Sequence, residues 1–373
     1  MKDARSLLIL QRGSGSAAAI RQLLEQFGDA DTALDAGPAA WRAAGVTQDR
    51  FALLRTPDTQ NLDADLRWLE DPCHHLIGWH SPDYPALLRG IGNPPALLFV
   101  AGDSDLLWHP QIAMVGSRRP SPGGRDHARQ FATSFASGGL VVTSGLAEGI
   151  DAAAHDGALI AGRTVAVIAS GTDIVYPASN RELMARIRSE GTIVSEHPPG
   201  TAPLQSHFPS RNRIVAGLAL GTLVVEAAIR SGALITARLA AESGREVFAL
   251  PGSIDNPMAR GCHRLIRQGA ALVESPGEVI DALVPMAGQL AHALRGRLAL
   301  DASVSANGLP RGGSGEIEPI QQTLWQALDQ DPATPDQLAE RTGLTVAALS
   351  AMLLAMELDG HITANHGRYV RRT

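Results

Sequence analysis

Cysteine is nearly missing from the sequence: only Cys73 and Cys262 occur in 373 residues, far apart and without a CxxC pair. Neither a disulfide framework nor a zinc knuckle is therefore expected. Long apolar runs are missing as well, because no stretch approaches the roughly 20 apolar residues that cross a bilayer. The first residues, MKDARSLLILQRGSG, lack the apolar stretch and small-residue cleavage site of a signal peptide. We expect a cytoplasmic protein without a membrane span.

An excess of positive charge is also missing. The chain has 32 Lys and Arg against 38 Asp and Glu, a formal net charge of −6, and Lys2 is the sole lysine. A global basic field is thereby excluded, so any nucleic-acid partner must meet a local basic patch. The hydrophobic content of 45% suffices for a full-sized core, and the length predicts two or three domains.

Residues 1–72 are rich in alanine, leucine and arginine, with short helical patterns broken at glycines. Proline just inside a helix start, as in GPAAWRAAGV, and glycine just past a helix end follow the usual cap preferences. The pattern predicts a small helical domain of the SAM or helix-hairpin-helix kind. Such units often bind nucleic acid, but this one has no clear basic cluster, so packing or partner docking is an equal alternative.

Between residues 73 and 294, helical stretches alternate with short β-branched runs such as IAMVGS, LVVTSG, TVAVIAS, TIVSE, TLVVEA and EVFALPG. Continuous apolar runs of this length predict strands buried on both faces, hence a parallel sheet with crossover helices. We predict an α/β domain with an extended Rossmann-like, doubly wound parallel sheet. Because ligands of such sheets bind beyond the carboxyl ends of the strands, one shared cleft is expected there.

Two further parts follow the α/β domain. Residues 295–316, ending in SVSANGLPRGGSGE, lack periodicity and predict a flexible linker. Residues 317–373 combine three helical patterns with a hairpin around NHG, which together predict a winged helix. This last part has seven acidic against four basic side chains. Since phosphate neutralisation needs cations, protein contact is favoured over DNA binding for it.

The first candidate site is the turn MVGSRRPSPGG, with Gly116, Ser117, Arg118 and Arg119 after an expected strand. Small residues let backbone N–H groups approach an anion at a helix N-terminus, and the arginines add charge-assisted hydrogen bonds. The dinucleotide pattern GxGxxG is absent, so the turn gives little support for an NAD site. The alternative is a structural tight turn with solvated arginines.

The second candidate site is SHFPSRNRIVAGL, which lies in a segment, 197–225, without any acidic residue. Arg211 and Arg213 suit phosphates, Asn212 suits a sugar, a base edge or the local backbone, and Phe208 offers a stacking face, worth ~1–3 kcal/mol per base. This combination is typical of single-strand binding. In the alternative, Phe208 anchors a core and the arginines pair with carboxylates or turn inward to brace the loop.

A third basic segment is DNPMARGCHRLIRQGAALVE, where Arg260, Arg264 and Arg267 occur with no acid between residues 255 and 274. Three acid-free basic segments in one domain of a net-acidic chain favour a local anion cleft more strongly than any one of them alone.

Enzymatic alternatives are weaker. SGLAEGIDAAAH holds Ser144, Glu148, Asp151 and His155, but the nucleophile elbow G-x-S-x-G is absent and a metal site would need a third ligand that the sequence does not place. Helix capping by the acids and a local hydrogen bond of the histidine explain the pattern better. We expect no catalytic residues, no metal and no cofactor.

The motifs of the central domain together resemble those of the DprA/Smf family, in the order and spacing expected for it. They are VGSRRPSPGG, SGLAEGIDAAAHDGAL, TVAVIASGTDIVYPASNREL, IVSEHPPG, FPSRNRIVAGL, VVEAAIRSGALITARLAAESGREVFALPG and GCHRLIRQGA. The helical N-terminal part and the winged helix also resemble longer members. Two departures stand out. Ala178 stands where some relatives carry a lysine, so one phosphate contact is either missing or supplied by Arg181, and the winged helix is not basic.

This resemblance implies a non-enzymatic protein that binds and protects single-stranded DNA, loads the RecA recombinase in natural transformation and forms a homodimer. It implies a DNA pocket made of Gly116, Ser117, Arg118, Arg119, Ser144, Gly145, Phe208, Arg211, Asn212 and Arg213. It also implies a dimer surface around His263, Ile266 and Leu272.

Two other functions stay open. Nucleotide phosphoribohydrolases of a similar fold use a PGGxGTxxE loop, which GLALGTLVVEA matches only in part, with one residue too many between Thr222 and Glu226. A DNA-binding regulator would act through its winged helix. The sequence specifies neither strand polarity nor the DNA footprint.

Overall fold

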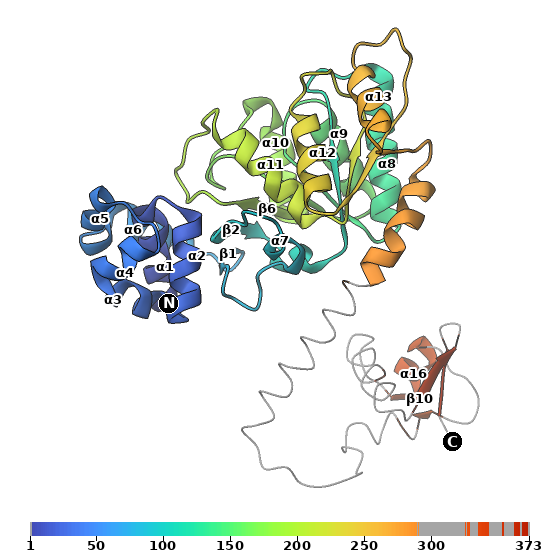
Figure 1. The fold of residues 1–373 in the computed structure, drawn as a ribbon. Helices are drawn as coiled ribbons and strands as arrows, with labels where there is room; N and C mark the ends of the chain where they lie inside the picture. Colours follow the sequence, from blue (N-terminus) through green and yellow to red (C-terminus); the bar gives the residue numbers. More distant parts are fainter. Residues whose placement is uncertain are drawn as a thin grey trace. The chain divides into compact units, whose positions relative to one another are not determined.

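The computed structural model describes residues 2–288 and 290 and, beyond them, 325, 327, 328, 335–342, 353, 362–365 and 368–371. The chain divides into two compact units, Met1–Arg297 and Leu298–Thr373 (Figure 1). The predicted linker, 295–316, lies outside the described residues. The predicted domain boundaries at 72, 294 and 316 stay predictions.

A nine-stranded sheet forms the centre of the first unit. Its order is β1-β2-β6-β5-β4-β3-β7-β8-β9; β1 and β2 pair antiparallel, β2 and β6 likewise, and all other pairs are parallel. The strands are β1 (His74–Gly78), β2 (Leu97–Gly102), β3 (Gln111–Val115), β4 (Val141–Ser144), β5 (Thr164–Val167), β6 (Thr192–Ser195), β7 (Gly221–Val224), β8 (Glu246–Ala249) and β9 (Ala271–Leu272). The predicted α/β fold with a mostly parallel sheet is confirmed.

Helices cover both faces of this sheet. The helices are α7 (Ala86–Arg89), α8 (Pro122–Ser137), α9 (Ile150–Ala161), α10 (Arg181–Glu190), α11 (His207–Leu218), α12 (Ala233–Glu242), α13 (Arg260–Arg267) and a last helix over residues 276–288, with 3-10 turns η2 (Ser104–Trp108) and η3 (Ala178–Asn180). In β3, Ile112 and Met114 pack with α8 and α9, whereas Ala113 and Val115 pack with α11, α12 and α13. Burial on both faces explains why the central strands are continuous apolar runs rather than alternating ones.

The winding direction of the sheet reverses at β3. From β3 the chain proceeds through β4 and β5 to β6 on one side, and then returns to β7, β8 and β9 on the other. In an open sheet of this kind, ligands bind in the crevice beyond the carboxyl ends of the strands near the reversal. The residues that follow β3, β4, β5 and β7 therefore surround the place where a ligand is expected.

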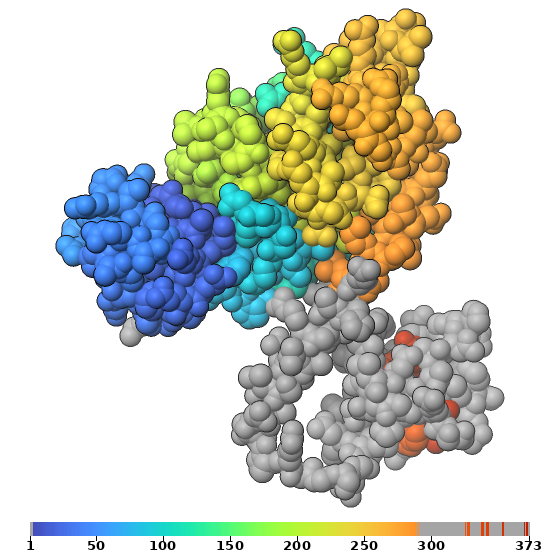
Figure 2. Space-filling view, in the orientation of Figure 1, coloured from blue at the N-terminus to red at the C-terminus, as the bar shows by residue number. Residues whose placement is uncertain are grey.

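The N-terminal helices close a core against the antiparallel edge of the sheet. Leu8, Ile20 and Leu23 are fully buried together with Leu97 and Phe99 of β2, and Figures 1 and 2 show the blue helices beside this cyan edge. Side-chain caps begin several of the helices, as expected for Ser and Asp at such positions. The helices are α1 (Lys2–Ser14), α2 (Ala17–Phe27), α3 (Ala30–Asp35), α4 (Gly37–Ala43), α5 (Phe51–Arg55) and α6 (Thr59–Trp68), with the 3-10 turn η1 (Gln48–Arg50).

In the second unit, the described elements are α16 (Pro335–Thr342) and an antiparallel hairpin of β10 (Ile362–Asn365) and β11 (Arg368–Arg371). The hairpin confirms the wing expected around NHG, since Asn365 pairs with Arg368 across the turn. The remaining predicted elements of the winged helix lie outside the described residues. None of the helices in the described part has the length and apolar character that a membrane crossing needs.

His155 joins α9 to the sheet from a fully buried position. Its Nδ1 lies 2.7 Å from the Thr164 hydroxyl, which itself donates to the carbonyl of Val142 at 2.6 Å. The Thr164 oxygen must therefore accept, so Nδ1 carries the proton of a neutral imidazole. Desolvation, and secondarily the charge of Arg211, lowers the pKa of His155 to about 3. The fold thus requires this ring to stay uncharged.

Acid is expected to destabilise the protein through His155. Its unfolded pKa is 6.5 and its folded pKa about 3, so the unfolded chain binds one more proton between these values, and stability falls as the pH decreases through that window. From about pH 7 to about pH 5 the loss is about 2 kcal/mol. Urea unfolding of wild type and His155→Gln across this range measures it. In the variant, the free energy of unfolding should depend less steeply on pH, by the equivalent of about one bound proton. Equal pH dependence in both proteins would contradict the assignment.

Candidate nucleic-acid interface

The turn after β3 presents Arg118 at the carboxyl edge of the sheet. The Ser117 N–H donates to the carbonyl of Glu226 at 2.6 Å, and the Ile150 N–H donates to the carbonyl of Ser117 at 3.1 Å. A Cβ on Gly116 would lie 2.6 Å from the Ile150 side chain, so only glycine fits this close approach. The backbone is therefore fixed from both sides, while the Arg118 side chain is exposed.

Phe208 and Tyr176 form an aromatic pair beside Arg118. Phe208 is half-buried in the first turn of α11, and its ring centroid lies 5.5 Å from that of Tyr176, which is 45% exposed. The Arg118 guanidinium lies 5.6 Å from the Phe208 ring centroid, within cation–π range. No carboxylate pairs with Arg118 among the described residues. An open guanidinium and two aromatic faces therefore stand together.

Two hollows meet at Phe208. The smaller, of about 140 Å³, opens between the loops after β4 and β5 and reaches Tyr176. The larger, of about 300 Å³, extends from Gly116 and Asn212 to the N-terminal end of α12. Both are lined by the same four residues, Arg118, Ala147, Phe208 and Arg211. We call these two adjoining hollows together the DNA-edge pocket.

Arg211 lines both hollows from beneath and is only 5% exposed, so the geometry favours a supporting role over the predicted phosphate clamp, which stays a prediction. Its Nη1 donates to the carbonyl of Val167 at 2.7 Å, and the guanidinium packs so closely on Gly145 that a Cβ there would lie 1.7 Å from Nη1. Asp151, also buried, accepts from the Gly145 and Ala147 N–H groups. Burial lowers the pKa of Arg211 and raises that of Asp151, and their mutual attraction opposes both shifts.

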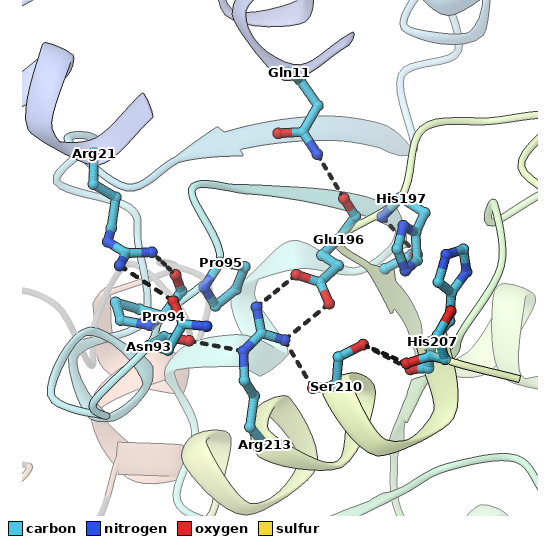
Figure 3. Close-up of polar contacts among 12 residues, drawn as sticks. Gln11, Arg21, Asn93, Pro94, Pro95, Glu196, His197, His207, Ser210 and Arg213 are labelled. Atoms are coloured by element: carbon cyan, nitrogen blue, oxygen red, sulfur yellow. Dashed lines mark hydrogen bonds and ion pairs between the residues drawn. The ribbon is translucent and has the colours of Figure 1, made fainter. Parts of the chain in front are cut away.

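Arg213 is used within the protein (Figure 3). It makes a two-pronged ion pair with Glu196 at 2.8 and 2.6 Å and donates to the carbonyl of Asn93 at 2.7 Å. Gln11 of α1 donates to the carbonyl of Glu196 at 2.9 Å, and Arg21 of α2 donates to the Asn93 side chain at 3.2 Å. Arg213 therefore ties α11, which carries Phe208, to the N-terminal helices.

Among the other predicted pocket residues, some are engaged in hydrogen bonds within the protein and others are open to solvent or line a hollow. The Ser144 hydroxyl donates to the carbonyl of Met114 at 2.5 Å and is fully buried, and the Ser117 hydroxyl accepts from the Arg119 N–H at 3.0 Å. Arg119 is exposed but lines neither hollow, whereas half-buried Asn212 lines the larger one. DNA contact by these residues stays a prediction, and the geometry favours supporting roles for the two serines.

Glu226 occupies the position at which Rossmann-type folds usually hold a phosphate. Its carboxylate accepts from the N–H and hydroxyl of Ser121, at 2.8 and 2.6 Å, and from the Asn256 side chain at 3.1 Å. It lies at the N-terminus of α8, against Gly124, where backbone N–H groups attract anions. A buried carboxylate already satisfied in this way is poorly placed to act on a nucleotide, which argues against the phosphoribohydrolase alternative.

The segment expected to mediate dimer contacts lies apart from the pocket. His263 Nε2 lies 3.0 Å from the carbonyl of Gly252, Ile266 is half-buried against the core, and Leu272 on the edge strand β9 is 47% exposed. The third basic segment also lies apart, because none of its arginines lines either hollow. The expectation of one cleft for all three basic segments therefore holds for two of them.

The comparisons with known proteins agree with this architecture. Residues 75–284 match the family model of DNA recombination-mediator protein A, and residues 312–368 match a DprA winged helix domain. The chain belongs to the DprA/Smf family. It is 40% identical to Protein Smf of Escherichia coli (strain K12) over 84% of this chain and 81% of that protein.

Two solved structures of DprA proteins are similar to the chain. DNA processing protein A from Streptococcus pneumoniae matches with a TM-score of 0.64 at 36% identity, over 74% of this chain and 97% of that one. The Helicobacter pylori protein, described for its unique single-stranded DNA binding mode, matches with a TM-score of 0.52 at 28% identity, over 57% of this chain and 96% of that one.

Sequence reasoning missed two contributors to this pocket. Tyr176 supplies the second aromatic face, and its signal was the YP dipeptide in a glycine-rich strand end. Asp151 was weighed as a catalytic, metal-binding or capping group, yet it holds the loop at Gly145 from beneath. That role depends on the buried environment shared with Arg211, which residue types alone do not reveal.

Replacing Arg213 is expected to weaken the fold. Arg213→Gln would leave Glu196 mostly buried without its cation, because the two side chains are only 12% and 15% exposed, and should lower the free energy of unfolding by about 2 to 4 kcal/mol. Denaturant unfolding measures this loss. Arg163→Gln, which breaks the more exposed pair with Asp103, should cost less than about 1 kcal/mol. Equal costs for both variants would contradict the proposed tie.

Proposed function

We propose that this DprA/Smf chain binds single-stranded DNA in the DNA-edge pocket. The carrying observation is the exposed Arg118 guanidinium, free of any carboxylate partner in the described part of the chain, placed over Phe208 where the two hollows meet. A guanidinium beside aromatic faces is the arrangement that tracks a phosphate while bases stack. The single-strand binding mode described for the Helicobacter pylori relative supports the proposal.

Single strands suit this pocket better than duplexes. A base in a duplex already has both faces stacked on its neighbours, so the rings of Phe208 and Tyr176 are useful only to unpaired bases. Arg118 then neutralises a phosphate, and the buried charge of Arg211 adds positive potential from below. Recognition would depend little on sequence, because every base has a face to stack.

We further propose that the chain is not an enzyme. The side chains that chemistry would use are engaged within the fold: the Ser144 hydroxyl with a carbonyl, His155 with Thr164, and Glu226 with Ser121. Membership of the family supports the wider role, in which the chain acts in the cytoplasm, protects incoming single strands and loads RecA onto them during natural transformation.

Two substitutions test the pocket. Arg118→Gln removes a phosphate contact and should weaken binding of an oligothymidylate about tenfold at low salt, with the salt slope reduced by about 0.7. Phe208→Leu removes the stacking face and should cost about 1 to 3 kcal/mol of binding free energy with little change of the slope. Fluorescence anisotropy across a salt series measures both.

Arg55→Gln, an exposed substitution on α5, is the matched control and should bind as wild type does. Unchanged affinity of both pocket variants at low salt would rule out the pocket assignment. The same variants give a second readout: each should lose the acceleration of RecA filament formation on single strands that wild type provides. Acceleration retained without DNA binding would separate RecA loading from the pocket.

We also propose that the chain forms a homodimer through His263, Ile266 and Leu272. The supporting observation is β9, the last strand at one edge of the sheet. Its two residues, Ala271 and Leu272, are both exposed. An apolar side chain on an open edge favours self-association of two copies.

Leu272→Arg tests this surface with little risk to the fold, because Leu272 is already 47% exposed. Two like charges would then meet across a symmetric interface, and the sedimentation mass should fall from dimer to monomer. Arg67→Gln, on the N-terminal helices, should leave the mass unchanged. A dimer that survives Leu272→Arg would place the interface elsewhere.

A further inference from the structure

A second basic depression lies between α12 and α13 over β8. It has a volume of about 790 Å³ and four of its lining side chains are arginines, Arg230, Arg238, Arg245 and Arg264, against one carboxylate, Glu246. We call it the arginine groove. In a chain with a net charge of −6, such a concentration of one sign needs an explanation.

Internal partners do not account for these arginines. Arg230 and Arg264 are exposed and make no ion pair with any described residue, and Arg238 has only a long contact with Glu242 at 3.6 Å, with both side chains mostly exposed. The Nε of Arg245 is buried without a partner within the described residues, while its Nη2 donates to a backbone carbonyl. The groove therefore keeps cations available to an external anion.

The arginine groove adjoins the DNA-edge pocket. Ser231 and Ile235 line both the groove and the larger hollow of the pocket, so the two are separated only by the residues at the start of α12. The groove is thus the next basic surface for a strand that leaves Phe208 through the larger hollow. Ile229, 51% exposed, and Leu234 supply apolar surface among the arginines, which suits sugars and bases as well as phosphates.

We propose that the arginine groove is a second subsite for the phosphodiester backbone of the same single strand that occupies the DNA-edge pocket. The proposal rests on the proposed function. It gives the third basic segment a role in DNA binding through Arg264, although this segment does not line the pocket. It also implies that the DNA footprint on one copy is longer than the pocket.

A second copy of the chain is a poorer occupant. A symmetric interface whose two-fold axis crossed the groove would set the four arginines of one copy against those of the other. An acidic protein segment matches the charge, but it would not explain why the groove adjoins the pocket. Position and charge together favour the nucleic-acid strand.

The experiment compares two oligothymidylates, of roughly 6 and roughly 20 nucleotides, by anisotropy across a salt series. Wild type should bind the long one more tightly and with a steeper salt slope. Arg230→Gln/Arg264→Gln should bind the short one within about twofold of wild type, but the long one about tenfold more weakly, with the slope reduced by about 1.4 for two lost phosphate contacts. The exposed pair Arg55→Gln/Arg67→Gln removes the same charge from the N-terminal helices and should match wild type at both lengths.

A long strand could also bind more tightly because it bridges two copies of the chain. Repeating the comparison in the Leu272→Arg background distinguishes such bridging from a subsite on the same copy. Persistence of the length effect there, and its loss in the groove variant, support a subsite on the same copy. If the groove variant binds the long strand as tightly as wild type does, the proposal is overturned. This holds also if the variant loses contact with RecA while its DNA affinity is unchanged. Failure of the proposed function looks different, because wild type would then bind neither oligonucleotide or Arg118→Gln would have no effect.

Discussion

The buried guanidinium of Arg211 holds the candidate interface together. It bonds to the end of β5 at Val167, packs against Gly145 after β4, and projects from α11, so three segments distant in sequence meet on one side chain. Burying a charge is costly, and here Asp151, itself held by two backbone N–H groups, offsets part of that cost. A side chain at position 145 would therefore have to displace the Arg211 guanidinium from these contacts.

This division of labour explains how an acidic chain presents a basic site. In FPSRNR, Arg211 turns inward and Arg213 pairs with Glu196, so neither arginine of the motif is the solvent-facing cation. That role belongs to Arg118, which comes from a different strand end and meets the motif at Phe208. The motif builds and aims the aromatic face, and a turn more than 80 residues earlier supplies the open charge.

The sequence predicted the layers and the strand ends well, because both follow from local patterns. Continuous β-branched runs marked the parallel strands, and Gly-Ser-rich ends marked the pocket. The antiparallel edge β1–β2 was not foreseen, since its pairing with β6 depends on the N-terminal helices that bury Leu97 and Phe99. The sequence also did not predict that Arg211 is buried while Arg213 forms an ion pair. Their partners include Val167, Glu196 and Asn93, which lie up to 120 residues away in the sequence.

Glu226 explains how, under the proposed function, a Rossmann-type sheet binds a polymer rather than a nucleotide. The helix dipole of α8 and its free N–H groups would ordinarily attract a phosphate at the point where the sheet reverses. An internal carboxylate lies there instead: Glu226 accepts from the N–H and the hydroxyl of Ser121, the N-cap of α8, and the Ser121 oxygen in turn accepts from the Gly124 N–H. The backbone carbonyl of Glu226 also anchors the turn that carries Arg118. In the proposed binding mode the ligand therefore binds at the rim formed by the residues after β4, β5 and the start of α11, where a polymer strand has room to continue past the pocket.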